Sequence, residues 1–437
     1  MATQSLTEQI DISNPNIEQK RMKMGNLLIF ACFFLYTASM AAKGVFAAEV
    51  KYIIDMWDLT QAKAQMANTW YFVAYGLVQV FLSIIIGKID VRKYLIVTVP
   101  IAALFTALMG VATRIEGIWV YFGLTGAFQA AIYAGSYWVL GNYLPNALLT
   151  KANKIMNMGY AVGTVVAYAL SALFIGYDLW QVPYFIIALV FLLSLVVFAV
   201  VTKNAKKFAK INLMLDEVKQ MEQPKNTKPL LNIKTKKDIA VFFVVALIFT
   251  FMFTSFYYAV MNFITSTLVE VHGVNQDVSI YVSIIAPIAI ITGPMLTISA
   301  CEKDRDFIRQ TIKFLLILLP IPLLLAFFYK VNVILYLLLA VAFVVLANGI
   351  KSITLSIMVF KMKNQINTGS YSAISNAIAS LAAGVAPVVI GAIKDASGWV
   401  ACYWVIFFAV AIVVLSLVLV RWLLTKENNK ENKKIEI

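Results

Sequence analysis

Stretches of about 20 apolar residues recur along this chain, and each is long enough to cross the hydrocarbon core of a lipid bilayer, roughly 30 Å thick. They occur between residues 25 and 422 of the 437-residue sequence. Hydrophobic residues make up 61% of the chain and charged residues 13%, whereas soluble domains are nearer half apolar and a quarter charged. We therefore expect an all-α integral membrane protein.

One long polar segment, residues 202–238, divides the apolar stretches into two sets of six. The predicted spans are residues 25–48, 67–87, 94–112, 117–140, 153–175, 183–201, 239–264, 278–300, 312–329, 333–358, 370–393 and 400–422. Two repeated membrane bundles in one chain give this pattern. We expect pseudo-symmetric six-helix bundles at 25–201 and 239–422, a lysine-rich linker between them, and polar tails at 1–24 and 423–437.

The net charge of +14 is distributed unevenly along the predicted topology. Most lysines and arginines fall in the two tails, the linker and alternate loops. The few that fall on the opposite side are Lys51, Lys63, Arg114, Lys330 and Lys394. This positive-inside bias predicts cytoplasmic N- and C-termini, and we expect the plasma membrane of a bacterium. The basic excess then indicates orientation and contact with anionic lipids, not a nucleic-acid surface.

Two lysines fall inside predicted spans, where an ionisable side chain is costly and needs a reason. Lys43 lies deep in the first span and Lys351 lies in the tenth. Since no carboxylate lies at the centre of any span, the two cations indicate a site for an anion. The alternative is snorkelling, in which the ammonium reaches the headgroups. This alternative is stronger for Lys351, which is closer to the end of its span.

One carboxylate, Glu49, lies within a predicted span, toward the outer end of the first. It is either an ordinary helix-end charge or a candidate for proton coupling. Polar and aromatic residues share helix faces with the lysines on four spans, where interhelical packing is the alternative interpretation. With the lysines, the expected substrate-binding residues are Tyr36, Gln129, Tyr133, Tyr137, Tyr257, Tyr258, Asn262 and Asn348.

The sequence offers no catalytic constellation, phosphate-binding glycine loop or metal-ligand cluster. Its single histidine, His272, falls in a predicted outer loop, and its three cysteines are scattered. We therefore expect no enzymatic activity, no cofactor and no metal.

Several short segments resemble the organophosphate:phosphate antiporters, a branch of the major facilitator superfamily that includes the glycerol-3-phosphate transporter. They are Phe33, Phe34, Tyr36, Ala38, Lys43, Phe46, Ala47 and Tyr52 in the first span, Ala74-Tyr75-Gly76, Phe128-Gln129, Asn157 to Gly163, and Leu268-Val269-Glu270-Val271. The resemblance implies two six-helix bundles around a cavity lined by spans one, four, seven and ten. It places Lys43 where that family has its substrate-phosphate arginine.

The sequence departs from that family at several positions. The second phosphate-binding arginine falls at Tyr257, a histidine of the fifth span falls at Tyr160, and a basic position of the second span falls at Gln79. Tyr160 thereby joins the expected substrate-binding residues. The superfamily's Gly-x-x-x-Asp-Arg signature maps onto residues 83–88, with Ser83 at its glycine and Gly87 at its aspartate.

We expect a secondary transporter that moves a small organic anion, such as a phosphate ester or carboxylate, by alternating access. Exchange is favoured over proton symport, because proton coupling commonly uses a buried carboxylate or histidine. Two alternatives stay open: a membrane sensor of an external organic anion, and a proton-coupled exporter of drugs or lipids. The expected partners are the solute and membrane lipids, with the protein acting as a monomer.

Overall fold

The computed structural model describes residues 15–85, 88–221, 236–303, 307–353 and 368–435. Within these ranges the secondary structure is helical and contains no strand. A helix satisfies its backbone hydrogen bonds internally, which is what crossing a hydrocarbon layer requires. The all-α prediction is confirmed.

The first half of the chain forms six long helices that pack around one buried hydrophobic core. They are α2 (Pro15–Trp57), α3 (Gln61–Ile85), α4 (Val91–Met109), α5 (Ile115–Tyr143), α6 (Asn146–Ile175) and α7 (Val182–Met221). Asp90 caps α4 by accepting a hydrogen bond from the backbone N–H of Lys93. In this half α2 packs on α6 and α7, and α5 packs on α3 and α4.

The second half forms its own core from helices that are more often interrupted. They are α8 (Lys236–His272), α9 (Gln276–Ser283), α10 (Ile285–Ala289), α11 (Thr292–Lys303), α12 (Phe307–Leu318), α13 (Pro320–Phe328), α14 (Val333–Ser352) and α16 (Thr368–Ile435). The break between α12 and α13 comes at Pro320, because proline has no backbone N–H to donate to the carbonyl oxygen four residues earlier. The chain bends within α16 at Gly398, whose φ of 77° suits glycine.

Each predicted span falls mainly on helix where the structure describes it, with breaks inside the eighth and ninth spans and turn residues at the end of the third. Among the described residues, nine stretches are long and apolar enough to cross a membrane by length and composition. One of them, Ile374–Leu419 in α16, covers most of both the eleventh and the twelfth predicted spans. α3 and α5 are not among these nine. The end of the tenth span, beyond residue 353, lies outside the described residues.

The structure differs from the prediction in the first part of the expected linker, residues 202–221. α7 continues as helix to Met221, past the predicted end of the span at residue 201, and α8 begins at Lys236. Residues 222–235 lie outside the described ranges. The division of the chain into two separate bundles at this linker stays a prediction.

The two halves lie against each other along α3 and α16. Glycines allow this close approach: a Cβ added at Gly384 would lie 3.0 Å from the Cβ of Phe72. The hydroxyl of Thr69 also donates to the carbonyl oxygen of Gly384, at 2.7 Å.

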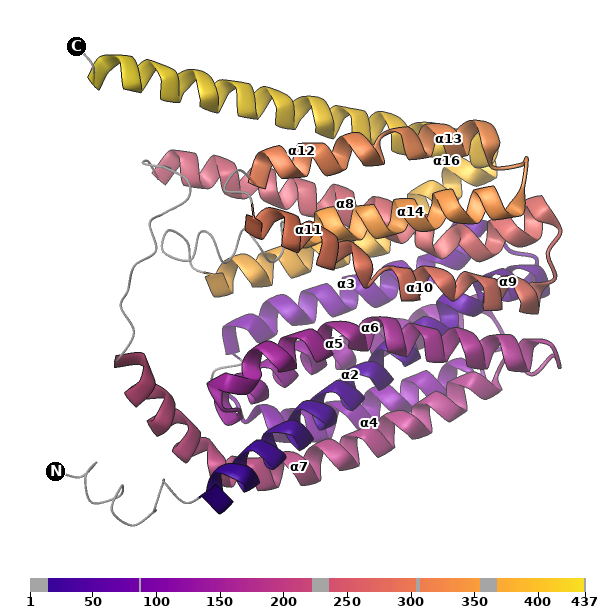
Figure 1. Cartoon of the computed structure of the whole chain (residues 1–437). Helices are drawn as coiled ribbons and strands as arrows, with labels where there is room; N and C mark the ends of the chain where they lie inside the picture. The colour runs from indigo at the N-terminus through magenta and orange to yellow at the C-terminus, as the bar shows by residue number, and fades with distance from the viewer. Residues whose placement is uncertain (1–14, 86–87, 222–235, 304–306, 354–367, 436–437) are drawn as a thin grey trace.

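The start of α2 and the end of α16 lie at the same end of the molecule (Figure 1), and we call the opposite end the far end. Here Glu270 of α8 pairs with Lys51 of α2 at 3.4 Å and with Lys394 of α16 at 3.1 Å. Asp395 accepts from the backbone N–H of Ala62 at 3.0 Å, which satisfies one of the free N–H groups at the start of α3. Charged side chains therefore tie the two halves together at the far end.

Candidate functional site

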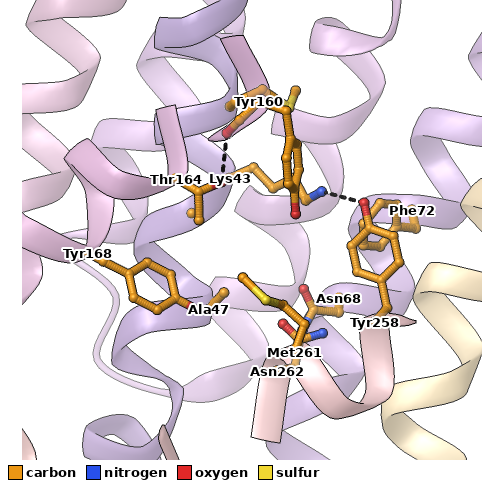
Figure 2. Close-up of a pocket in the computed structure, with 12 residues that line it drawn as sticks. Lys43, Ala47, Asn68, Phe72, Tyr160, Thr164, Tyr168, Tyr258, Met261 and Asn262 are labelled. Atoms are coloured by element: carbon orange, nitrogen blue, oxygen red, sulfur yellow. Dashed lines mark hydrogen bonds between the residues drawn. The ribbon is translucent and has the colours of Figure 1, made fainter. Parts of the chain in front are cut away.

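A compact pocket lies between α2, α3, α6 and α8, so both halves contribute to it (Figure 2). Its lining residues are Met40, Lys43, Gly44, Ala47, Asn68, Phe72, Tyr160, Thr164, Tyr168, Tyr258, Met261 and Asn262. The free space accommodates about one or two water molecules. The pocket is therefore nearly closed in this conformation, and an organic solute needs it to open.

Lys43 of α2 is enclosed by aromatic side chains inside this pocket. Its Nζ donates to the hydroxyl of Tyr258 at 3.1 Å. The same atom lies 4.6 Å from the ring centroid of Phe72, 5.1 Å from that of Tyr160 and 4.8 Å from that of Tyr258. These are cation–π distances, and no ion pair to Lys43 is found among the described residues. The structure therefore places the ammonium of Lys43 among aromatic rings.

Lys351 of α14 lies near the same site, on the other half of the molecule. Its Nζ is 4.8 Å from the ring centroid of Tyr257, and the hydroxyl of Tyr257 donates to that of Tyr160 at 3.0 Å. Lys351 is also close enough to Lys43 for the two charges to repel each other. The two cations are thus linked through a pair of hydrogen-bonded tyrosines.

Three of the other predicted tyrosines form an aromatic group next to the pocket. The ring centroid of Tyr36 lies 5.2 Å from that of Tyr133, which lies 4.7 Å from that of Tyr137. Tyr36 precedes Lys43 on α2 by about two helical turns, or roughly 10 Å. The aromatic surface therefore extends from the pocket toward the end of the molecule where α2 begins.

Two predicted site residues form hydrogen bonds away from the pocket. Gln129 accepts a hydrogen bond from the hydroxyl of Tyr71 at 2.9 Å, within the core of the first half. The Nδ2 of Asn348 donates to the carbonyl oxygen of Ile290 at 3.2 Å, where α10 ends. Neither lines the pocket, and the pocket has no lining from α5 or α14, the fourth and tenth spans.

Glu49 is not an exposed helix-end charge. Its side chain is 0% exposed, and neither carboxyl oxygen has a hydrogen-bond partner of good geometry. The hydroxyls nearest to it belong to Ser171 of α6 and Tyr184 of α7. Glu49 therefore faces the core of the first half and does not line the pocket.

Sequence reasoning missed the contribution of α3 and, from α6, all lining residues except Tyr160. Asn68 and Phe72 of α3 are spaced by four residues and share a helix face. Tyr160, Thr164 and Tyr168 of α6 follow the same spacing, so the pattern was visible in the sequence. All of them except Tyr160 were passed over, because the resemblance pointed to a cavity lined by other spans.

The pocket lining is suited to binding, not to bond-breaking chemistry. It combines an ammonium, tyrosine hydroxyls and two amides with apolar walls, and none of the described residues that line it is a carboxylate. Among the described residues no group of three histidine, cysteine, aspartate or glutamate side chains could hold a metal.

Comparisons with known proteins give the family. The profile of the Major Facilitator Superfamily matches residues 28–365. A mutant of the nucleoside transporter NupG has a similar structure, with a TM-score of 0.66 and 13% identity, covering 90% of this chain and 99% of that one.

A bacterial homolog of the human lysosomal transporter Spinster, inward-facing and unoccupied, gives a TM-score of 0.60 at 16% identity, covering 91% of this chain and 95% of that one. Comparison with curated protein sequences finds no match. The solved structures share the fold at low identity, and the profile covers most of the chain. This chain therefore belongs to the Major Facilitator Superfamily and is a multi-pass membrane transporter, not an enzyme.

Proposed function

We propose that this transporter moves a small organic anion, such as a phosphate ester or a carboxylate, across the plasma membrane. The observation that carries the proposal is Lys43, a cation held among aromatic rings in a pocket without a lining carboxylate. A cation away from water is stabilised by an opposite charge. An anion in the pocket supplies that charge and also accepts from the Tyr258 hydroxyl.

Lys351 supplies a second positive charge from the other half of the molecule. Lysine is a compact point charge and lacks the fork of donors with which arginine grips a phosphate. The site therefore accepts carboxylates as well as phosphate esters. The further predicted residues Tyr36, Tyr133, Tyr137 and Tyr257 guide the solute or hold the lysines, while Gln129 and Asn348 act in packing.

Transport occurs by alternating access of the two halves around this central site. The positive-inside bias puts both termini in the cytoplasm, so the far end faces outward. The contacts of Glu270 with Lys51 and Lys394 then close the outer side in this conformation. The absence of a carboxylate from the pocket lining favours exchange of one anion for another over proton symport.

The test begins with purified full-length protein and a thermal-shift screen of phosphate esters, carboxylates and amphipathic cations. We expect anions to stabilise the wild type and Lys63→Met, in which an exposed lysine paired with Glu116 is removed. Lys43→Met should lose the effect. Stabilisation by cations that is indifferent to Lys43 would instead support a drug or lipid exporter.

Counterflow into proteoliposomes separates a transporter from a sensor. Vesicles are loaded with the stabilising anion, and uptake of its labelled form is measured. We expect uptake only when the internal anion is present. Binding without any uptake would favour the sensor.

A further inference from the structure

The pocket has a second polar end besides Lys43. Asn68 of α3 and Asn262 of α8 both line it, and their amide groups point into the space below the Lys43–Tyr258 hydrogen bond (Figure 2). Asn262 follows Tyr258 by four residues, so both side chains leave the same face of α8. One amide comes from each half of the molecule, and neither has a role in the anion site described above.

Asn262 presents an unused donor. Its side chain is 6% exposed, and its Nδ2 has no hydrogen-bond partner. A buried N–H group without an acceptor is destabilising, and such groups are uncommon in folded proteins. The neighbouring pocket space is where an acceptor can stand.

Asn68 presents an unused acceptor. Its side chain is 4% exposed, and its Nδ2 donates to the Oε1 of Gln65 at 2.5 Å. Gln65 is itself 0% exposed, so this bond fixes the orientation of the Asn68 amide. The carbonyl oxygen of Asn68 takes part in no hydrogen bond with the described residues and is available to a donor.

A free donor beside a free acceptor matches one chemical group especially well. A hydroxyl accepts one hydrogen bond and donates another, so it satisfies Asn262 and Asn68 together. A carbonyl can only accept and leaves Asn68 unpaired. The side chains of Met40, Met261 and Phe72 line the pocket as well, and they offer apolar contact to a short carbon skeleton.

We propose that Asn68 and Asn262 form a hydroxyl-recognising subsite, and that the transported solute is a hydroxylated organic anion. Its charge binds at Lys43 and its hydroxyl binds between the two amides. This inference rests on the proposed function, because it takes the Lys43 end of the pocket as the anion site.

The experiment compares anions that differ by hydroxyl groups alone. Glycerol phosphate is paired with propyl phosphate, and lactate is paired with propionate. Each is added as a competitor to the labelled stabilising anion, whose counterflow is measured in proteoliposomes that contain the full-length protein. In the wild type we expect at least one hydroxylated member to compete about tenfold better than its partner, as one hydrogen bond to an otherwise unpaired buried group provides.

Variants then assign that preference to the two amides. Asn262→Leu and Asn68→Leu should bring the ratio within each pair to about one, while competition by propyl phosphate or propionate stays as in the wild type. Asn142→Leu is the matched control, because Asn142 bonds to the carbonyl oxygen of Trp138 in α5. It should keep the wild-type ratio. Where a leucine variant fails to give monodisperse protein, the alanine variant at that position takes its place.

The outcomes separate this inference from the proposed function. Anions that compete in a Lys43-dependent way, but with equal strength within both pairs, overturn the subsite and leave anion transport intact. A preference that persists in both asparagine variants does the same. If no anion competes, or Lys43→Met competes like the wild type, the proposed function itself fails.

Discussion

Tyr257 of α8 donates its hydroxyl hydrogen to the hydroxyl of Tyr160 on α6, across 3.0 Å. Each ring also lies near one lysine: Tyr160 near Lys43 at 5.1 Å and Tyr257 near Lys351 at 4.8 Å. In the resemblance to the organophosphate:phosphate antiporters, Tyr160 falls at a histidine of that family and Tyr257 falls at an arginine. The pair therefore connects the two halves of the transporter at the same place where it holds the two cations.

Replacing Lys43 tests the anion site directly. We expect Lys43→Ala to abolish anion transport, because a charge-assisted hydrogen bond of about 1.5–3 kcal/mol is lost, a decrease in affinity of roughly 10- to 100-fold. Expression and chromatographic behaviour should stay normal, since the side chain lines a pocket and makes no ion pair with the described residues. Uptake at the wild-type rate in this variant would contradict the proposal.

Lys351 should matter most for solutes with two negative charges. It acts across the tyrosine pair and does not line the pocket. We therefore expect Lys351→Met to weaken the binding of a phosphate ester by about tenfold, which is about 1.4 kcal/mol. Binding of a monocarboxylate should weaken by less. Dissociation constants for one anion of each kind provide the measurement. An equal loss for both kinds, or no loss, would argue against a second charge at the site.

Hydropathy and charge in the sequence predict the helical fold and its most informative residue. A lysine deep in an apolar span stands out because it is costly there, which singled out Lys43. The breaks between α9, α10 and α11 were not predictable, because apolar composition does not reveal where a helix is interrupted. The burial of Glu49 was missed for a related reason: its position near a span end says nothing of the helices that cover it.

Contacts between distant segments were beyond sequence reasoning altogether. Lys51, Glu270 and Lys394 are ordinary loop or helix-end charges until the fold brings them together. The same holds for Asn68, because all its neighbours in the pocket except Phe72 come from other helices. Spacing along one helix predicts a shared face, but it does not predict which partner that face meets.

The packing of α6 against α2 depends on Gly163. A Cβ there would collide with the backbone carbonyl oxygen of Thr37, and backbone cannot move aside cheaply. We expect Gly163→Ala to lower the free energy of unfolding by about 1–3 kcal/mol. Gly141→Ala is the control, since a Cβ at Gly141 meets nothing within 4 Å; it should be neutral or slightly stabilising. The measurement is thermal unfolding of both purified variants. Equal stability of Gly163→Ala and Gly141→Ala would contradict the close contact.

Removing the charge of Glu270 should loosen the far end of the molecule. Glu270→Gln loses the ion pairs with Lys51 and Lys394, which hold α2, α8 and α16 together. Spin labels at Thr60→Cys and Ala396→Cys report the distance between the two halves there. We expect a single short distance in the background protein and an added longer one with Glu270→Gln. Glu116→Gln, whose partner Lys63 lies in the same half, should leave the distance unchanged, and a short distance in both variants would refute the prediction.

Replacing Glu49 tests whether transport is exchange or proton symport. Its carboxyl group is fully buried beside Ser171 and Tyr184 and away from the pocket lining. A buried carboxyl without a cationic partner is far less costly as the neutral acid, so glutamine should replace it without loss of exchange. We expect Glu49→Gln to retain counterflow, and a pH gradient across empty proteoliposomes to drive no concentrative uptake in either protein. Concentrative uptake that collapses with a protonophore, present in the wild type and absent in Glu49→Gln, would overturn exchange. The buried carboxyl would then be the proton site, coupled to Lys43 through α2, the helix that carries both residues.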